Sequence, residues 1–233
     1  MKNNNNIHSI ILARGGSKGI KNKNLKHINN KPLVYWSIKK SLDSKKINYT
    51  WVSSDSKKIL NYSKKNGALI IKRPKKLSKD QSSSESAWIH GINYIKKKGF
   101  KLDNIVGIQP TSPIRSGKDF DKAIKIFEKD DLDSLFTSTK INDFFVWKKN
   151  KNNKFIANYN YKHRKPRQLI HDQYLENGSF FIFKSSKFLK NKCRLFGKIG
   201  TFILPKSKSF QIDEKEDLEI LNILSKKYLY NRD

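Results

Sequence analysis

A short glycine-rich and cationic stretch near the N-terminus has the residue types that hold a phosphate chain. It directly follows the apolar run 10–13, which suits a strand buried on both faces. Glycines let backbone N–H groups approach a ligand closely, and arginine and lysine add positive charge. The stretch includes Arg14, Gly16, Ser17, Lys18, Lys23 and Asn24. Neither G-x-x-x-x-G-K-S/T nor G-x-G-x-x-G occurs, so the stretch predicts a phosphate loop of another type in preference to a plain surface turn.

Polar residues also follow each later apolar run that could form a strand. They are Ser53, Ser54 and Asp55, then Arg73, then Gln109, Thr111, Ser112 and Arg115, and finally Gln211 and Asp213. In a doubly wound sheet ligands bind at the carboxyl ends of the strands, so these residues would meet the glycine-rich stretch there. The combined set is cationic and poor in acids, which suits a polyphosphate substrate better than hydrolysis by paired carboxylates. No G-x-S-x-G nucleophile elbow is present.

Asp213 immediately precedes a predicted helix, and this position gives its carboxylate two alternative roles. One is capping of the helix N-terminus, and the other is binding of Mg²⁺, which proteins hold with one or two carboxylates plus substrate phosphates. The five histidines have no metal-ligand spacing, and Cys193 is the only cysteine, which excludes an intrachain disulfide and a multi-thiolate metal site. Asp55 is the one candidate general base, although helix capping is its expected role.

Strand-like and helix-like segments alternate over residues 7–139 and would position these side chains. Apolar runs predict strands at 10–13, 49–53, 68–71, 104–108 and 133–139. Apolar stripes at helical spacing predict helices at 31–42, 54–66, 82–98 and 118–129. Pro32 suits the first turn of the first helix, and Ser82 with Glu85 matches a capping box for the third. This alternation predicts an α/β fold, with a doubly wound, mostly parallel sheet and helices on both faces.

The alternation breaks at residues 142–176, which predict a small inserted β-hairpin within a single domain of residues 1–233. An exposed turn at 149–153 separates two groups of apolar residues, namely Phe144, Phe145, Val146 and Trp147, then Phe155, Ile156 and Tyr159. Exposed aromatic side chains are typical of interfaces, so we expect the insertion to contact a second copy of the chain. The main fold resumes with strands at 179–183 and 201–204 and a final helix from about Glu214.

The chain of 233 residues has a formal net charge of +30, which raises nucleic-acid binding as an alternative function. Its lysines are spread along the whole chain, whereas binders usually concentrate charge on one element, so a solvated lysine surface is favoured. No apolar run approaches the ~18 residues of a membrane span, and the polar N-terminus lacks the apolar core of a signal peptide. We therefore expect a cytoplasmic protein that binds neither nucleic acid nor a membrane.

Nine short motifs together resemble the acylneuraminate cytidylyltransferases, also called CMP-sialic acid synthetases. Their order and spacing agree from residue 7 to about 222. The first motif and Gln-Pro-Thr-Ser-Pro-x-Arg are specific to this group, and the related 3-deoxy-manno-octulosonate cytidylyltransferases carry a different first loop. The motifs lie at 11–20, 23–25, 31–33, 52–55, 72–74, 109–115, 166–168, 176–179 and 212–213.

This resemblance implies a Rossmann-type fold like that of nucleotide-diphospho-sugar transferases. It implies a reaction of CTP with a nine-carbon acidic sugar that gives a CMP-sugar and pyrophosphate. The residues implied to hold the nucleotide are Arg14, Gly16, Ser17, Lys18, Lys23, Asn24 and Arg73. The residues implied to contact the sugar are Ser84, Gln109, Arg167, Asn177 and Phe181. Asp213 would bind Mg²⁺ (or Mn²⁺), and the catalytic residues would be Arg14, Lys23 and Asp213. The family is dimeric through the inserted hairpin, which helps to form the neighbour's site.

Several positions depart from the pattern of that family. Gln211 stands where members often have a second aspartate, and Phe181 replaces a tyrosine of some relatives. Arg194 and Leu195 stand where some sialic acid enzymes have an aromatic pair. Asp217 could supply a second carboxylate or only complement the helix N-terminus. These departures leave legionaminate, pseudaminate or 3-deoxy-manno-octulosonate open as the sugar beside N-acylneuraminate itself.

Overall fold

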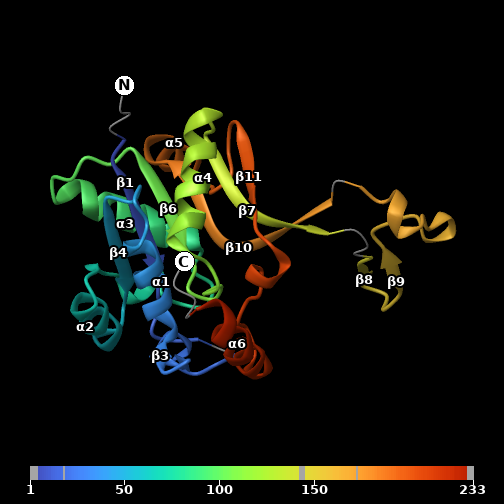
Figure 1. The fold of residues 1–233 in the computed structure, drawn as a ribbon, viewed down its shortest axis with the longest axis horizontal. Helices are drawn as coiled ribbons and strands as arrows, with labels where there is room; N and C mark the ends of the chain where they lie inside the picture. The colour runs from blue at the N-terminus through green and yellow to red at the C-terminus, as the bar shows by residue number, and fades with distance from the viewer. Residues whose placement is uncertain (1–4, 18, 142–144, 172, 230–233) are drawn as a thin grey trace.

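The alternating apolar runs form one sheet of seven strands (Figure 1). The computed structural model describes residues 5–17, 19–141, 145–171 and 173–229. The strands are β1 (Ile7–Leu12), β4 (Tyr49–Ser54), β5 (Leu69–Lys72), β6 (Asn104–Ile108), β7 (Ser134–Ile141), β10 (Gln173–Lys184) and β11 (Ile199–Ile203). Their order is β11-β7-β10-β6-β1-β4-β5, and only β10 runs antiparallel to its neighbours in this described sheet. The predicted doubly wound, mostly parallel α/β sheet is confirmed.

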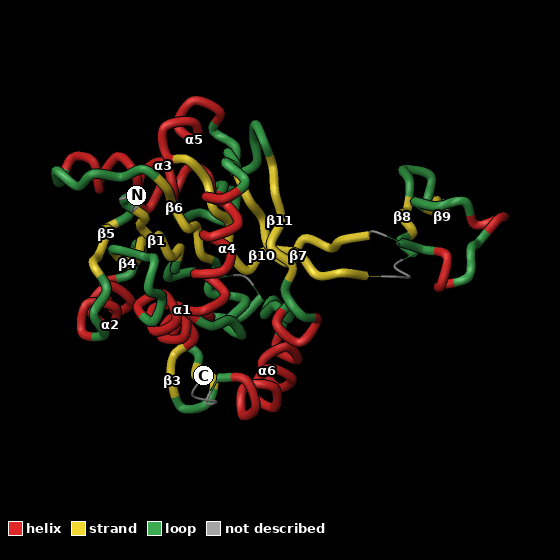
Figure 2. Tube along the Cα trace, turned by 45° about the horizontal axis from the view of Figure 1, so that its top comes forward, coloured by secondary structure: helices red, strands yellow, loops and turns green. Residues whose placement is uncertain are grey.

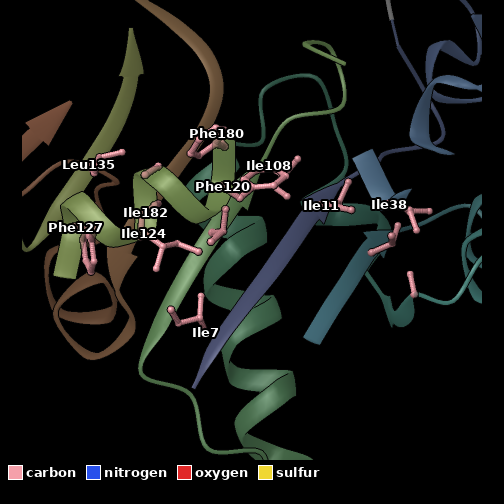
Figure 3. Packing of buried hydrophobic residues seen from close by; sticks show 14 of the residues in the cluster. Ile7, Ile11, Ile38, Ile108, Phe120, Ile124, Phe127, Leu135, Phe180 and Ile182 are labelled. Atoms are coloured by element: carbon pink, nitrogen blue, oxygen red, sulfur yellow. The ribbon is translucent and has the colours of Figure 1, made fainter. Parts of the chain in front are cut away.

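Helices pack on both faces of the sheet because successive strand residues point to opposite sides. They are α1 (Leu33–Leu42), α2 (Lys57–Lys65), α3 (Ser84–Lys97), α4 (Gly117–Lys129), α5 (Ser185–Asn191) and α6 (Lys215–Tyr228). On β1, Ile11 packs in one buried cluster with Phe120 of α4 and Phe180 of β10 (Figure 3), whereas Ile10 packs in another with Trp88 of α3. Burial on both sides explains why the central strands β1 and β6 contain apolar runs without polar alternation, whereas the edge strand β5 is partly exposed. Among the described residues, no helix is long and apolar enough to cross a membrane.

The predicted start of α3 at a capping box of Ser82 and Glu85 is wrong by one residue. Ser83 is the cap, because its hydroxyl accepts a hydrogen bond from the backbone N–H of Ser86 at 3.1 Å. Glu85 instead pairs with Arg194, with 2.6 Å between Oε1 and Nε. A small second sheet also stands where the first turn of α1 was expected; its strands are β2 (His27–Ile28) and β3 (Lys31–Pro32).

β7 and β10 continue beyond the sheet as a two-stranded ribbon that carries the insertion away from the body of the molecule (Figures 1 and 2). Past this ribbon, β8 (Trp147–Lys149) and β9 (Phe155–Ala157) form the predicted hairpin. The insertion is shorter than the predicted range 142–176, because residues 173–176 belong to β10. Residues 142–144 and 172, and with them Phe144, lie outside the described part of the chain.

β10 changes register where the ribbon meets the sheet. Glu176 lies opposite Ser138, whereas Phe181 lies opposite Phe136, so residues 177–180 bulge out of the ladder with β7, although Phe180 still pairs with Ile108 of β6. Gly178 has a left-handed φ of +60° in this bulge, a conformation that glycine adopts without strain. The bulge therefore depends on a glycine at the point where the insertion joins the sheet.

Candidate functional site

A cavity of about 410 Å³ opens at the carboxyl ends of β1, β5 and β6. Its walls come from the loop after β1, the loop 74–83, the first turn of α3, the loop after β6 and the segment before α6. This is the edge at which a doubly wound sheet binds its ligand. Eight of the residues implied to hold the nucleotide, the sugar or the metal line the cavity, namely Arg14, Ser17, Lys23, Asn24, Arg73, Ser84, Gln109 and Asp213, and Thr111 lines it beside them.

Asp55 holds the turn that begins the glycine-rich loop. Its Oδ1 accepts a hydrogen bond from the backbone N–H of Gly15 at 2.8 Å. A Cβ on Gly15 would lie 2.9 Å from Cβ of Ser56, so a larger residue would push the loop away from the end of β4. The helix-capping role expected for Asp55 is wrong, because Ser56 is the cap of α2. Asp55 is engaged with the loop backbone and does not line the cavity.

The far end of the glycine-rich loop packs against the segment that carries Asp213. A Cβ on Gly19 would overlap the backbone carbonyl oxygen of Asp213, so the close approach requires glycine. Lys23 Nζ donates to the carbonyl oxygen of Ile212 at 2.7 Å and lies 3.2 Å from Asp213 Oδ1. The loop and Asp213, although distant in sequence, therefore form one continuous wall of the cavity.

Arg14 is held in the cavity by contacts that its own loop and the loop 74–83 provide. Its Nη2 lies 2.9 Å from Oδ1 of Asp80, and its carbonyl oxygen accepts a hydrogen bond from Asn24 Nδ2 at 2.9 Å. Asp80 was not predicted as a site residue, since the polar loop 74–83 has no apolar periodicity that would place it in the fold. An anion that binds the Arg14 guanidinium competes with this carboxylate.

Arg73 is a buried cation with unused hydrogen-bond donors. It lines the cavity but is only 5% exposed, and its Nε and Nη2 atoms have no acceptor among the described residues. Burial lowers the pKa of Arg73 to about 10, with the Asp55 carboxylate acting in the opposite direction and the Arg14 charge adding to the decrease. Leaving a buried donor unsatisfied costs about 1–3 kcal/mol, and more when it is charged. The cavity is therefore suited to a ligand atom that accepts hydrogen bonds from Arg73.

Asp213 presents an exposed carboxylate and does not cap α6. Glu214 is the cap, and Asp217 Oδ2 accepts hydrogen bonds from the backbone N–H groups of Asp213 and Glu214, both at 2.7 Å. The capping role considered for Asp213 is therefore wrong, and Asp217 is used in the cap.

Asp213 offers one exposed carboxylate to a Mg²⁺ ion, whose other ligands would have to come from substrate and water. The Asp213 side chain is 70% exposed and faces the cavity beside the glycine-rich loop. Across the described ranges, no three His, Cys, Asp or Glu side chains converge on one point, so the protein offers no preformed metal cage there. Mg²⁺ commonly binds with one or two carboxylates plus phosphates and water, and a single carboxylate beside the cationic glycine-rich loop is compatible with that pattern.

Asn177 and Gln211 brace the bulge of β10 instead of facing the cavity. The Asn177 side chain is buried, and its Oδ1 accepts hydrogen bonds from Thr137 Oγ1 at 2.6 Å and from the backbone N–H of Ser179 at 3.2 Å. Gln211 Nε2 donates to the carbonyl oxygen of Asn177 at 2.6 Å. The sugar contact predicted for Asn177 is not supported, because its carboxamide is occupied within the protein.

Phe181 lies in the core and not on the cavity wall. It is fully buried, with its ring centroid 6.0 Å from that of Trp88, and the Arg194 guanidinium carbon lies 4.8 Å from its ring centroid. The sugar contact predicted for Phe181 is not supported, because its ring is buried in the core.

Arg167 belongs to the insertion, where its backbone begins a short 3-10 helix, Arg167–Leu169. Gly16 adjoins the cavity without lining it, and Lys18 lies outside the described residues.

Two solved structures that are named as synthases of cytidylyl compounds have the same fold. The chain superposes on CMP:2-keto-3-deoxy-manno-octonic acid synthetase complexed with CTP with a TM-score of 0.70 and 17% identity, over 95% of this chain and 99% of that one. It superposes on 4-diphosphocytidyl-2C-methyl-D-erythritol synthase with a TM-score of 0.70 and 9% identity, over 94% and 98% of the two chains. At these identities the likeness concerns the fold.

Several proteins have sequences that align with most of this chain. It is 30% identical to post-translational flagellin modification protein B of Campylobacter coli over 94% of this chain and 95% of that protein. It is also 30% identical to pseudaminic acid cytidylyltransferase of Campylobacter jejuni, over 93% and 95%. Identity with N-acylneuraminate cytidylyltransferase A of Danio rerio is 35% over 76% of this chain, which spans only 41% of that longer protein. A cytidylyltransferase family model matches residues 8–231, and the chain therefore belongs to the cytidylyltransferase family.

Proposed function

We propose that the chain transfers the cytidylyl group of CTP to a nine-carbon acidic sugar, an N-acylneuraminate or a related nonulosonate. The anomeric hydroxyl oxygen of the sugar forms a bond to the α-phosphorus, the bond from that phosphorus to the bridging oxygen breaks, and pyrophosphate leaves as the hydroxyl proton is lost. The observation that carries the proposal is that one cavity is lined both by the buried Arg73, whose Nε and Nη2 donors have no acceptor among the described residues, and by the cationic glycine-rich loop.

Positioning and charge neutralisation supply the rate in such a phosphoryl transfer, since little covalent chemistry is required of the protein. Arg14 and Lys23 line the same cavity and would hold the triphosphate where charge develops on the departing pyrophosphate. Mg²⁺ held by Asp213 and the phosphates would neutralise phosphate charge and lower the pKa of the attacking hydroxyl. Arg73 would donate hydrogen bonds to the nucleotide through Nε and Nη2. Ser84 and Gln109 are the predicted sugar contacts that lie on the cavity.

Pseudaminate is the second candidate for the sugar. The pseudaminic acid cytidylyltransferase of Campylobacter jejuni aligns with this chain over 95% of its own length, whereas the longer N-acylneuraminate enzyme of Danio rerio is matched over 41%. Both sugars are nine-carbon 2-keto acids, so the proposed roles of Arg14, Lys23 and Asp213 are the same for either. The choice between them depends on the contacts of the sugar's side chain and acyl groups.

A panel of sugars assayed with CTP and Mg²⁺ tests this function. We expect pyrophosphate release to require CTP, Mg²⁺ and a nonulosonate, and kcat/KM for the preferred sugar to exceed that for 3-deoxy-manno-octulosonate by about 100-fold or more. The panel comprises N-acetylneuraminate, legionaminate, pseudaminate and 3-deoxy-manno-octulosonate. Equal turnover of all four sugars, or release of pyrophosphate without any sugar, would contradict the proposal.

We also propose that the insertion joins two copies of the chain. The hairpin, which lies past the end of the ribbon and away from the body (Figure 2), exposes large apolar side chains, among them Trp147, Phe155 and Ile156. Sedimentation equilibrium should give twice the chain mass of 27.2 kDa. Ile156→Asp is expected to shift the protein to monomers, because it places a charge on an apolar contact surface. Ile223→Asp, on α6 and 72% exposed, is the matched control and should leave the dimer intact. A wild-type protein that sediments as a monomer would contradict this proposal.

A further inference from the structure

Arg115 is a buried cation that the proposed reaction does not use. The residue is 2% exposed and forms no ion pair with any described carboxylate. Asp119, the acid whose charge acts on it, pairs with Lys208 at 2.6 Å instead. Burial lowers the pKa of Arg115 to about 9, with Asp119 acting in the opposite direction. A buried charge without a paired carboxylate is costly, so the contacts that it makes must repay its desolvation.

The Arg115 guanidinium joins three elements of the fold through five hydrogen bonds. Nη1, which has two hydrogens and so shares one of them, donates to the carbonyl oxygen of Ser112 at 2.7 Å and to the carbonyl oxygen and hydroxyl of Ser179 at 2.8 and 3.0 Å. Nη2 donates to the hydroxyl of Ser37 at 2.7 Å and to the carbonyl oxygen of Gln109 at 3.0 Å. Both ends of the loop 109–112 are thereby fixed to β10 and α1.

The loop that Arg115 fixes is part of the cavity. Gln109, Pro110 and Thr111 all line it, yet Arg115 does not. The carbonyl oxygen of Thr111 accepts a hydrogen bond from the backbone N–H of Ile212 at 2.9 Å, and Asp213 follows directly. One loop therefore sets the place of the predicted sugar contact and of the proposed metal ligand.

We propose that Arg115 is a positioning residue that holds Gln109 and Asp213 in one fixed arrangement. This inference rests on the proposed function, since it concerns the sugar and Mg²⁺ sides of that same site. Arginine is required because its planar fork can reach acceptors on both ends of the loop, on β10 and on α1 at once. Lysine has one nitrogen and cannot span these acceptors.

Arg115→Lys, compared with Phe188→Leu, separates positioning from stability. Phe188 is a fully buried core residue of α5 in the cluster that contains Trp88. Phe188→Leu is therefore the control that lowers the stability of the protein, as Arg115→Lys does, but at a site away from the loop 109–112. Each variant is assayed at the same interval below its own Tm. We expect Arg115→Lys to raise the KM for the sugar and the Mg²⁺ concentration for half activity by about 10-fold to 100-fold. CTP binding without Mg²⁺ should change less than about 2-fold, and Phe188→Leu should change none of the three.

Two serine variants decide the matter if Arg115→Lys does not fold. Ser37→Ala removes only the hydroxyl on α1, and Ser179→Ala only the hydroxyl on β10. Each is expected to raise the sugar KM by about 3-fold or more and to speed amide hydrogen exchange at Gln109, Thr111 and Ser112 but not in α5. Unchanged sugar KM and unchanged exchange in both serine variants would overturn the inference. If the wild type turned over no sugar, the proposed function would be wrong. If the serine variants changed hydrogen exchange but not the sugar KM, Arg115 would only stabilise the loop, and its positioning role would be wrong.

Discussion

Asp213→Asn is expected to lower kcat/KM for CTP turnover by about 100-fold or more while the protein remains folded. The substitution keeps the shape of the side chain but removes the charge that would hold Mg²⁺ against the triphosphate. Asp213 is exposed and does not cap α6, so the free energy of unfolding should change by no more than about 0.5 kcal/mol. Pyrophosphate release and thermal unfolding measure the two quantities.

Glu216→Gln is the matched control for Asp213→Asn. It removes the same charge from an exposed residue in the first turn of α6, one that does not line the cavity. We expect its kcat/KM to stay within about 2-fold of the wild type, since long-range effects of an exposed charge are screened by salt. Full activity of Asp213→Asn at limiting Mg²⁺ would exclude the metal role of this carboxylate.

Arg73→Met is expected to weaken CTP binding by about 30-fold to 100-fold and to stabilise the free protein. The first effect is the loss of hydrogen bonds from a charged donor, worth about 2–3 kcal/mol. The second follows because the free protein leaves Nε and Nη2 buried without acceptors. An apolar side chain of similar length removes these unsatisfied donors, each of which costs about 1–3 kcal/mol when buried, so we expect the free protein to become more stable. Calorimetric titration with CTP and thermal unfolding without it measure both changes.

The neighbouring Lys72→Met serves as the control for Arg73→Met. Lys72 is exposed at the end of β5 and carries the same charge, but it does not line the cavity. Its CTP affinity and its Tm should stay close to those of the wild type. If Arg73→Met lowered the Tm and left CTP affinity intact, Arg73 would be a structural cation and its open donors would have no ligand to meet.

The central strands could be predicted from the sequence because they are buried on both faces. β6 begins and ends where the apolar run 104–108 predicted, since all five of its residues are buried. β10 is much longer than the predicted 179–183, because its outer part, Gln173–Glu176, is exposed and has no apolar run. Only its pairing with β7 makes that part a strand, and such a pairing leaves no local signal.

The same distinction holds for the cavity. Arg14, Arg73 and Gln109 could be predicted because each follows an apolar run that forms a strand, and the topology brings the ends of parallel strands to one edge. The partner of Arg14, Asp80, could not, because its loop has no pattern that relates it to β1. The burial of Phe181 did have a signal, since Phe180–Phe183 is an unbroken apolar run typical of a strand without a free face.

The bulge at 177–180 lets the inner and the outer part of β10 pair in two different registers, whereas a continuous strand has a single register along its whole length. The inner part of β10 is registered by its buried phenylalanines, and the outer part is registered only by its pairing with β7. In an unbroken strand, one added residue turns every later side chain to the opposite face. Here the change of register absorbs such an addition before it reaches the core. Over evolutionary time the insertion can therefore gain or lose residues while Gln109 and Asp213 keep their places.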